Sequence, residues 1–261
     1  MRAQRGTVAA LLLAAVVAGC TEISTDPQRP LSLQFDSLPA LAIVVGDTMR
    51  GGDLLPARVP VKVFNSNGSA VSDSQIRLLG IDSTSVRAFT VIGGLQLRGI
   101  VEAAAVRIVA QAGSLQSQTQ TFAVHPRPTL LGIGDTLADS IVYDGIDTTK
   151  RFRDVSATLY RKVGDSTARF LDGLRVRFRV ASFTDSILDS VRILPTTGGR
   201  AISSTLVTGG LATVKVKAYP KAGARGRGSV SVEATFSVFG RPVAGSPLLL
   251  PVTLVPFTIV P

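Results

Sequence analysis

The chain has 261 residues, a formal net charge of +10 and only one Cys and one His. The triads, dyads and zinc sites built from several Cys or His side chains are therefore excluded. Neither a Walker loop nor a dinucleotide-binding fingerprint occurs in the sequence. We therefore predict a protein that is not an enzyme and that holds neither a cofactor nor a metal ion.

The N-terminus has the parts of a bacterial export signal. Arg2 and Arg5 are followed by an uncharged apolar stretch over residues 8–18, and small residues precede Cys20. This stretch is too short to span a bilayer, which takes roughly 20 residues. With its Val-Ala-Gly-Cys ending, the segment resembles the lipobox of bacterial lipoproteins. The resemblance implies that residues 1–19 are a signal peptide, cleaved before Cys20, and that the Cys20 thiol carries a diacylglycerol.

The same resemblance implies where the protein is found. Two or more acyl chains anchor a protein stably in a membrane. We therefore expect the protein to be attached to a membrane through the lipid on Cys20. Thr21 follows the lipid site, and in many Gram-negative bacteria a residue other than Asp there permits sorting to the outer membrane. We expect a cell-envelope location, facing the surface or the periplasm, with residues 20–30 as a flexible tether. The alternative is a cleaved secretory signal that contains a chance cysteine.

Beyond the tether, apolar residues alternate with polar ones, which is typical of half-buried β-strands. The clearest runs are LSLQF (31–35), VPVKVF (59–64), LRVRFRV (174–180), ATVKVKA (212–218) and SVSVEATF (229–236). The pair Asn67-Gly68 is a strong hairpin signal, because both residues tolerate positive φ. Short strands of this kind, separated by turn residues, predict β-sandwiches.

Two motifs recur in the same order. AIVVGDTM (42–49) returns as LLGIGDTL (130–137), and VIGGL (91–95) returns as VTGGL (207–211). Because the two motifs recur in the same order, we predict two copies of one fold. The segment between the two motifs is longer in the second copy than in the first. The proline-containing VHPRPT (124–129) marks the join. The predicted domains are therefore 31–126 and 127–261.

A likeness to a known family covers roughly residues 31–261, and four segments of the second copy illustrate it. The series DGLRVRFRV, TLVTGGLATVKVKA, GSVSVEATF and VAGSPLLLPVTLVP resembles the core and closing strands of bacterial immunoglobulin-like domains, including those of invasin-type and intimin-type surface proteins. The resemblance implies an all-β chain of two tandem immunoglobulin-like β-sandwiches. It also implies a stalk, spacer or adhesion module that binds a protein or another envelope component. The identity of that partner stays unknown, because a fold does not determine which ligand is bound.

The positive charge lies in the second copy. Residues 20–126 carry 8 Lys and Arg against 8 Asp and Glu, whereas residues 127–261 carry 18 against 10. Alternation places Arg175, Arg177 and Arg179 on one face of a strand, and Lys215 and Lys217 on one face of another. These residues either bind an envelope polyanion such as lipopolysaccharide or form the solvated faces of a sandwich, with Glu233 paired to Lys215 or Lys217.

Composition favours the solvated faces. The chain has no Trp and three Tyr, and binders of single-stranded nucleic acid usually offer aromatic platforms on which bases stack. We therefore expect no specific nucleic-acid partner. The oligomeric state is not fixed by the sequence.

The acidic residues have two interpretations. Asp185 and Asp189 are four residues apart and suit pairing with the basic strands, while a second group lies within 20 residues, namely Asp135, Asp139, Asp144, Asp147 and Asp154. The second group is either a calcium site or a set of solvated turns, and its spacings match no known calcium loop. His125, in the Pro-containing join, is expected to be a solvated spacer.

Overall fold

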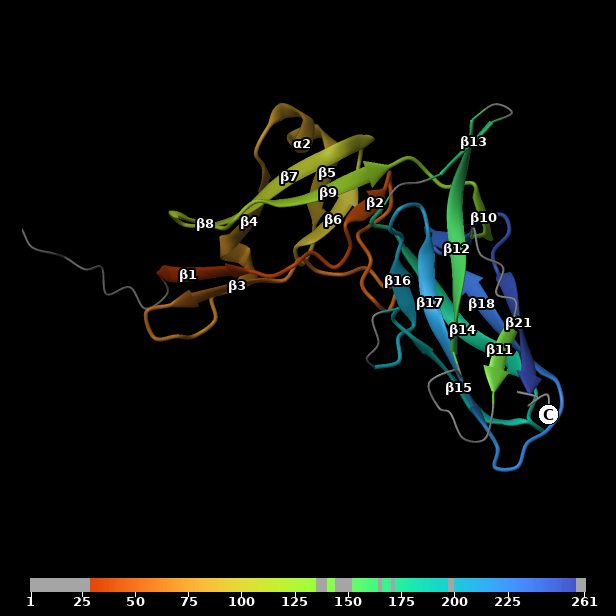
Figure 1. Ribbon diagram of the computed structural model, residues 1–261. Coiled ribbons are helices and arrows are strands. Elements are labelled where there is room, and N and C mark those ends of the chain that lie inside the picture. The colour runs from red at the N-terminus through yellow and green to blue at the C-terminus, as the bar shows by residue number, and fades with distance from the viewer. Residues whose placement is uncertain are drawn as a thin grey trace, which may run out of the picture.

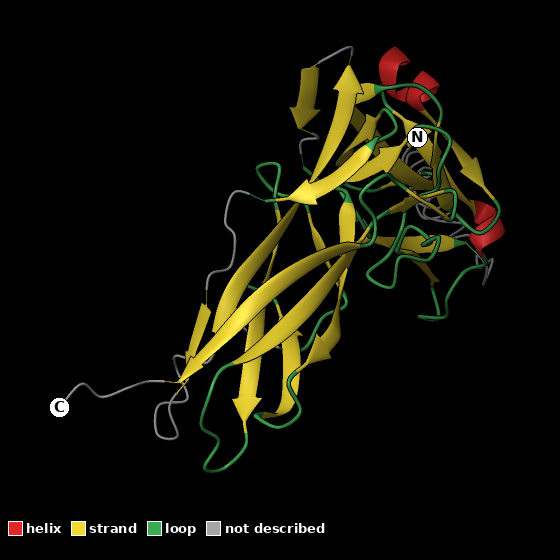
Figure 2. Ribbon diagram, turned by 90° about the vertical axis from the view of Figure 1, so that its right-hand side faces the viewer, coloured by secondary structure: helices red, strands yellow, loops and turns green. Residues whose placement is uncertain are grey.

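The computed structural model describes residues 29–134, 140–143, 152–163, 166–169, 172–196 and 200–256. Nearly all of its regular structure is β, which confirms the predicted all-β fold class (Figures 1 and 2). Cys20, the signal peptide and the tether up to residue 28 lie outside the described residues.

The first unit consists of the strands up to residue 125. They are β1 (Pro30–Phe35), β2 (Ala42–Val44), β3 (Val61–Asn65), β4 (Ile76–Gly80), β5 (Phe89–Ile92), β6 (Gln96–Gly99), β7 (Ala103–Ala112), β8 (Leu115–Gln116) and β9 (Gln120–His125). Two short helical turns, η1 (Asp73–Gln75) and α2 (Ser83–Ala88), are inserted between them. Alternation of apolar residues did not predict α2, which begins because Ser85 N donates to the capping Asp82 carboxylate.

One sheet of the first unit has the strand order β2-β9-β7-β4, and β2 runs parallel to β9. The opposite side is made of the pairs β1-β3 and β5-β6, which an isolated antiparallel bridge between Arg58 and Gln96 connects. Figure 1 shows β7 and β9 crossing above β1 and β3. The side chains between these layers form one core, in which Met49, Leu97, Val106 and Ile108 are fully buried.

The second unit is built from the later strands. They are β10 (Leu130–Ile133), β11 (Ser140–Tyr143), β12 (Phe152–Val163), β13 (Ser166–Arg169), β14 (Arg175–Phe183), β15 (Leu188–Leu194), β16 (Ser204–Leu206), β17 (Ala212–Pro220), β18 (Gly228–Thr235), β19 (Ser237–Val238), β20 (Arg241–Pro242) and β21 (Leu248–Pro256).

Its two large sheets have the orders β10-β12-β17-β15 and β11-β21-β18-β14-β16. The first strand is split between the sheets, because β10 pairs antiparallel with β12 whereas β11 pairs parallel with β21. These pairings give the ABED and GFC sheets of an immunoglobulin-like sandwich. The parallel pairing of an early strand with the last strand, seen for β11 and β21, also occurs in the first unit, where β2 is parallel to β9.

The repeated motifs occupy partly equivalent places. The GGL turns precede β6 in one unit and β17 in the other, and Gly94 and Gly210 both have positive φ. The other pair differs, because residues 42–44 form the parallel partner of β9 whereas Leu130–Ile133 form the antiparallel partner of β12.

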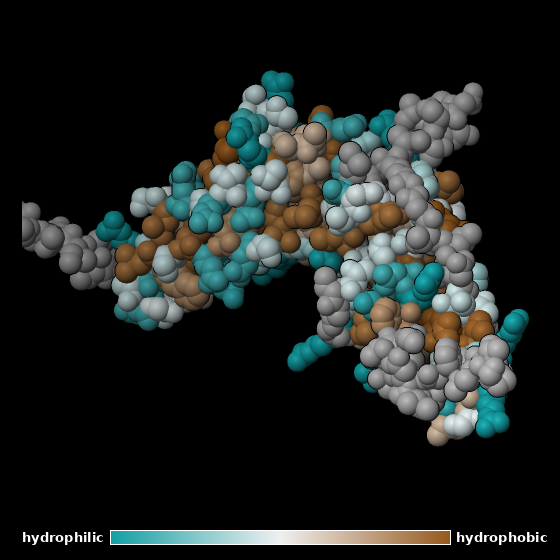
Figure 3. All heavy atoms as spheres, in the orientation of Figure 1, coloured by the Kyte–Doolittle hydropathy of each residue, from teal (hydrophilic) through white to brown (hydrophobic). Residues whose placement is uncertain are grey.

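Alternation along the strands separates core from surface. On β14, Val176 and Phe178 are buried while Arg177 and Arg179 are exposed, and on β17 the Val side chains point inward. In the space-filling view, hydrophilic and hydrophobic residues are interspersed over both units (Figure 3). Of the helices that the structure describes, none combines the length and hydropathy that crossing a membrane requires.

Candidate functional site

The two units meet along the backbone before β2. Leu41 N and Ala42 N both donate to Gly173 O at 3.2 Å, and Gly173 N donates to Val207 O at 2.8 Å. Gly173 has φ +99°, and a Cβ added there would lie 2.5 Å from Leu41 C. Only glycine suits this position, because the left-handed backbone and the close approach both exclude a side chain.

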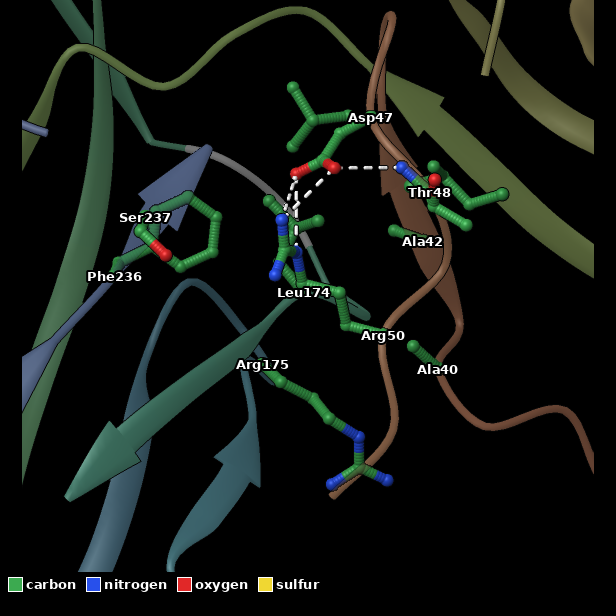
Figure 4. Close-up of a pocket in the computed structure, with 11 residues that line it drawn as sticks. Ala40, Ala42, Asp47, Thr48, Arg50, Leu174, Arg175, Phe236 and Ser237 are labelled. Atoms are coloured by element: carbon green, nitrogen blue, oxygen red, sulfur yellow. Dashed lines mark hydrogen bonds and ion pairs between the residues drawn. The ribbon is translucent and has the colours of Figure 1, made fainter. Parts of the chain in front are cut away.

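An acidic side chain connects the first unit to the β19–β20 turn of the second. Asp47 accepts hydrogen bonds from Thr48 N at 2.8 Å and Phe239 N at 3.3 Å, and it is nearly buried. The Arg50 guanidinium donates to both of its oxygens, with Nη2 3.0 Å from each (Figure 4). Two backbone amides and the Arg50 guanidinium therefore satisfy the carboxylate, as a buried charge requires.

The glycine of the same motif completes the contact. Gly46 has φ +82°, and a Cβ there would lie 2.6 Å from Phe239 Cζ. Gly46 therefore leaves room for the Phe239 ring, while Asp47 binds the Phe239 amide.

Further polar contacts join the units around this cluster. Arg175 Nε donates to Pro39 O at 2.9 Å, and Ser204 Oγ donates to Gly52 O. Arg161 lies 3.6 Å from Glu102. His125 Nε2 lies 3.2 Å from Asp172 O, in hydrogen-bonding reach for the tautomer that carries its proton there. His125 is thus the last residue of β9, partly exposed, and it contacts the second unit in addition to lying in the join that the sequence indicated.

Apolar packing continues across the junction. Ala42 and Val44 of β2 belong to the buried cluster of the second unit, and Leu206 of the second unit packs on the core of the first. The remaining cavity, lined by Asp47, Arg50 and other residues of the junction, has about 20 Å³. That is the size of one water molecule, so the junction is a structural contact and not a ligand pocket.

Replacing Asp47 with Ala is expected to lower the free energy of unfolding by about 1–3 kcal/mol, because the Arg50 guanidinium and the Phe239 amide lose their acceptor. Denaturant titration followed by circular dichroism measures the change. Asp53→Ala is the matched control, since among the described residues the Asp53 carboxylate accepts only from Leu55 N, on the exposed surface. Equal losses in both variants would contradict the role assigned to Asp47.

The five basic residues singled out in the sequence do not form one stripe. Arg175 turns into the junction, where burial lowers its pKa. Arg177 and Arg179 lie on the outer face of the sheet that contains β14. Lys215 and Lys217 lie on the outer face of the other sheet. Because both sheets turn their apolar sides to one core, these two faces point in opposite directions.

The predicted partner of Glu233 was also wrong. Arg179 Nε and Nη2 each donate to the Glu233 carboxylate at 2.8 Å, and this bond lowers the pKa of Glu233. The two residues are directly opposite on β14 and β18. The two lysines are on the opposite sheet and cannot reach Glu233.

The acidic residues give no metal site among the described parts of the chain. Asp135, Asp139, Asp144 and Asp147 lie outside those parts, while Asp154 lies on β12 opposite Lys215. Asp185 lies in the turn before β15, and Asp189 is the second residue of β15. Within the described ranges, no three His, Cys, Asp or Glu side chains are placed to hold a metal ion together.

The motif that forms part of the junction could be recognised in the sequence, but its contact with the second unit could not. The V-G-D-T motif stood out as a repeat in the sequence, and it contributes Gly46 and Asp47 to the contact. Its partner Phe239 lies 192 residues further along the chain. No local pattern relates two segments that far apart.

No protein-family model matches the sequence, and no curated protein matches it. Similar solved structures include domains 4 and 5 of the S-layer protein SbsC, with 11% identity, a TM-score of 0.27, and coverage of 88% of this chain and 100% of that one. The Yersinia pseudotuberculosis adhesin InvE shares 13% identity at a TM-score of 0.33, with 88% of this chain and 61% of that chain covered.

An endo-fucoidan hydrolase of glycoside hydrolase family 107 scores 0.36, with 12% identity and coverage of 88% of this chain and 34% of that one. The chain thus spans less than two thirds of the adhesin and of the hydrolase. Likenesses this weak support no assignment of activity.

Proposed function

We propose that the protein is a non-catalytic interaction module of the bacterial cell envelope, lipid-anchored to the outer membrane through Cys20, that holds two immunoglobulin-like sandwiches as a spacer or adhesion unit. The observation that carries the proposal is the junction between the units. It combines continuous apolar packing with hydrogen bonds to Gly173 and Asp47.

Such a junction suits a spacer. Domains in one chain ordinarily move relative to each other unless their interface is large and apolar. Here the backbone amides of residues 41–42 donate hydrogen bonds to Gly173 O, and the side chains of Ala42 and Val44 belong to the core of the second unit. A fixed junction carries the distal surface away from a membrane in a constant direction, whereas a flexible join would let it fold back.

The sequence supports the proposed anchor. Cys20 is the only cysteine, so its thiol has no partner for an intramolecular disulfide. A lipid on Cys20 and a polar tether before β1 would set the first unit close to the membrane and the second unit further out.

Labelling with a radioactive or clickable fatty acid in a Gram-negative host tests the anchor. We expect the wild-type chain to incorporate the label and to fractionate with the outer membrane, because two or more acyl chains anchor stably. Cys20→Ser is expected to lose both the label and the membrane association. A Cys20→Ser chain that stays in the membrane fraction would contradict the proposed anchor.

Protease treatment of intact cells then distinguishes the two locations. Cleavage of both units on intact cells supports an adhesion module at the surface. Cleavage only after permeabilisation supports a spacer that faces the periplasm. Protection of both units in permeabilised cells that still cleave a periplasmic marker would contradict both forms of the proposal.

A further inference from the structure

The outer face of the β12-β17-β15 sheet gathers cations around two aromatic rings. Lys215 Nζ lies 4.4 Å from the centroid of the Phe152 ring. Lys217 Nζ and Arg192 Cζ lie 5.3 and 5.4 Å from the centroid of the Tyr219 ring. The Phe152 side chain is 42% exposed. The five residues come from three adjacent strands and share one face of the sheet.

The charges on this face are not balanced. Arg192 is directly opposite Lys217 across β15 and β17, and like charges in that position destabilise a sheet. The one carboxylate in register is Asp154, opposite Lys215. Among the described residues, none forms an ion pair with Lys215, Lys217 or Arg192.

The opposite face of the sandwich provides an internal comparison. There, Arg179 stands opposite Glu233 and forms a bidentate ion pair with it. That is the usual way in which a sheet stabilises a surface cation. Among the described residues, the three cations of the β12-β17-β15 face instead have no carboxylate within ion-pair distance, and a ligand that carries anionic groups would neutralise them.

We propose that this cation–aromatic face, formed by Phe152, Arg192, Lys215, Lys217 and Tyr219, binds a linear polysaccharide that carries carboxylate or sulfate groups. Lys215 and Lys217 are about 7 Å apart along the strand, and the face extends for roughly 13 Å from residue 215 to residue 219. Anionic substituents of successive sugars would bind the three cations, while the sugar C–H groups pack on the Phe152 and Tyr219 rings.

Other classes of partner fit this face less well. Binders of single-stranded nucleic acid usually offer several aromatic platforms for base stacking, and the chain has no Trp and three Tyr. Membrane insertion needs a larger set of exposed apolar side chains than the single Phe152 ring. A protein interface buries about 800 Å² on each partner, and this strip of roughly 13 Å by 10 Å is much smaller.

The inference names a ligand class for the proposed interaction module, and it rests on that proposal only for the absence of catalysis. Binding is measured on the full chain with Cys20→Ser in solution, so it depends on neither the anchor nor the junction. Failure to bind would therefore remove this inference and leave the lipid-anchored spacer standing.

The test uses calorimetry or thermophoresis with dextran sulfate and polygalacturonate as the anionic probes and neutral dextran as the uncharged one. We expect binding to at least one anionic probe, none to neutral dextran, and weaker binding as salt rises from about 0.05 to 0.5 M. Lys215→Ser together with Lys217→Ser should weaken binding at least tenfold. Phe152→Leu should weaken it about threefold, because the ring contacts are lost.

The control is Arg177→Ser together with Arg179→Ser. This control also removes two positive charges, but from the opposite face of the sandwich. Its affinity for the anionic probe should stay within about twofold of the wild-type value. A control that weakens binding as much as the lysine pair would overturn the site, because the attraction would then follow net charge alone. The inference is also overturned if neither anionic probe binds, or if only oligothymidine or anionic vesicles bind.

Discussion

Replacing Gly173 with Ala is expected to separate the two sandwiches and to lower the free energy of unfolding by about 2–5 kcal/mol. The new Cβ would lie 2.5 Å from Leu41 C and 2.7 Å from Ala42 N, so the backbone segments must move apart. That movement lengthens and weakens the hydrogen bonds that Leu41 N and Ala42 N donate to Gly173 O. The positive φ adds strain of about 1–3 kcal/mol.

Gly226→Ala separates the two contributions. Gly226 has φ +110°, close to that of Gly173, but a Cβ there meets nothing within 4 Å. It should therefore show the cost of the backbone angle alone. Small-angle scattering should give a broader distribution of distances for Gly173→Ala and an unchanged one for Gly226→Ala. If both variants scatter like the wild type, the junction does not depend on the approach at Gly173.

The sequence predicted the strands because their alternation is local. Each inward Val or Phe is two residues from the next, so a period of two is visible without any tertiary information. The same pattern assigned Val214 and Val216 to the core and Lys215 and Lys217 to solvent, and the structure agrees.

The sequence could not show which basic strands face the same way. Alternation gives the side of a strand on which a residue lies, but not the sheet to which that strand belongs. β14 pairs with β18, whereas β17 pairs with β12 and β15. For this reason the sequence did not show that Arg177 and Arg179 face away from Lys215 and Lys217, and Phe152 was missed because it enters the face from a third strand.

The junction was hidden for a related reason. Its contacts join the segment around Asp47 to Gly173 and Phe239, which lie more than a hundred residues away in the chain. Nothing local in the sequence distinguishes Gly46 and Gly173 from the glycines of ordinary turns. Their role appears only when the would-be Cβ positions are compared with the opposing unit.

Phe178→Ala is expected to be the most destabilising single truncation in β14, with a loss of about 3–5 kcal/mol in the free energy of unfolding. The Phe178 ring is 1% exposed and lies in the core between the two large sheets of the second unit. Removing it takes apolar surface out of the core and leaves a cavity, because the surrounding strands are fixed by their ladders. Urea titration followed by circular dichroism measures the loss.

The neighbouring residue provides the control for that truncation. Arg177 is exposed on the same strand, so Arg177→Ala should change the free energy of unfolding by less than about 0.5 kcal/mol. A large difference between two adjacent positions follows only if β14 turns one side to the core and the other to solvent. Comparable losses at Phe178 and Arg177 would mean that the Arg side chains of LRVRFRV stabilise the fold, and the assignment of this face to solvent would be wrong.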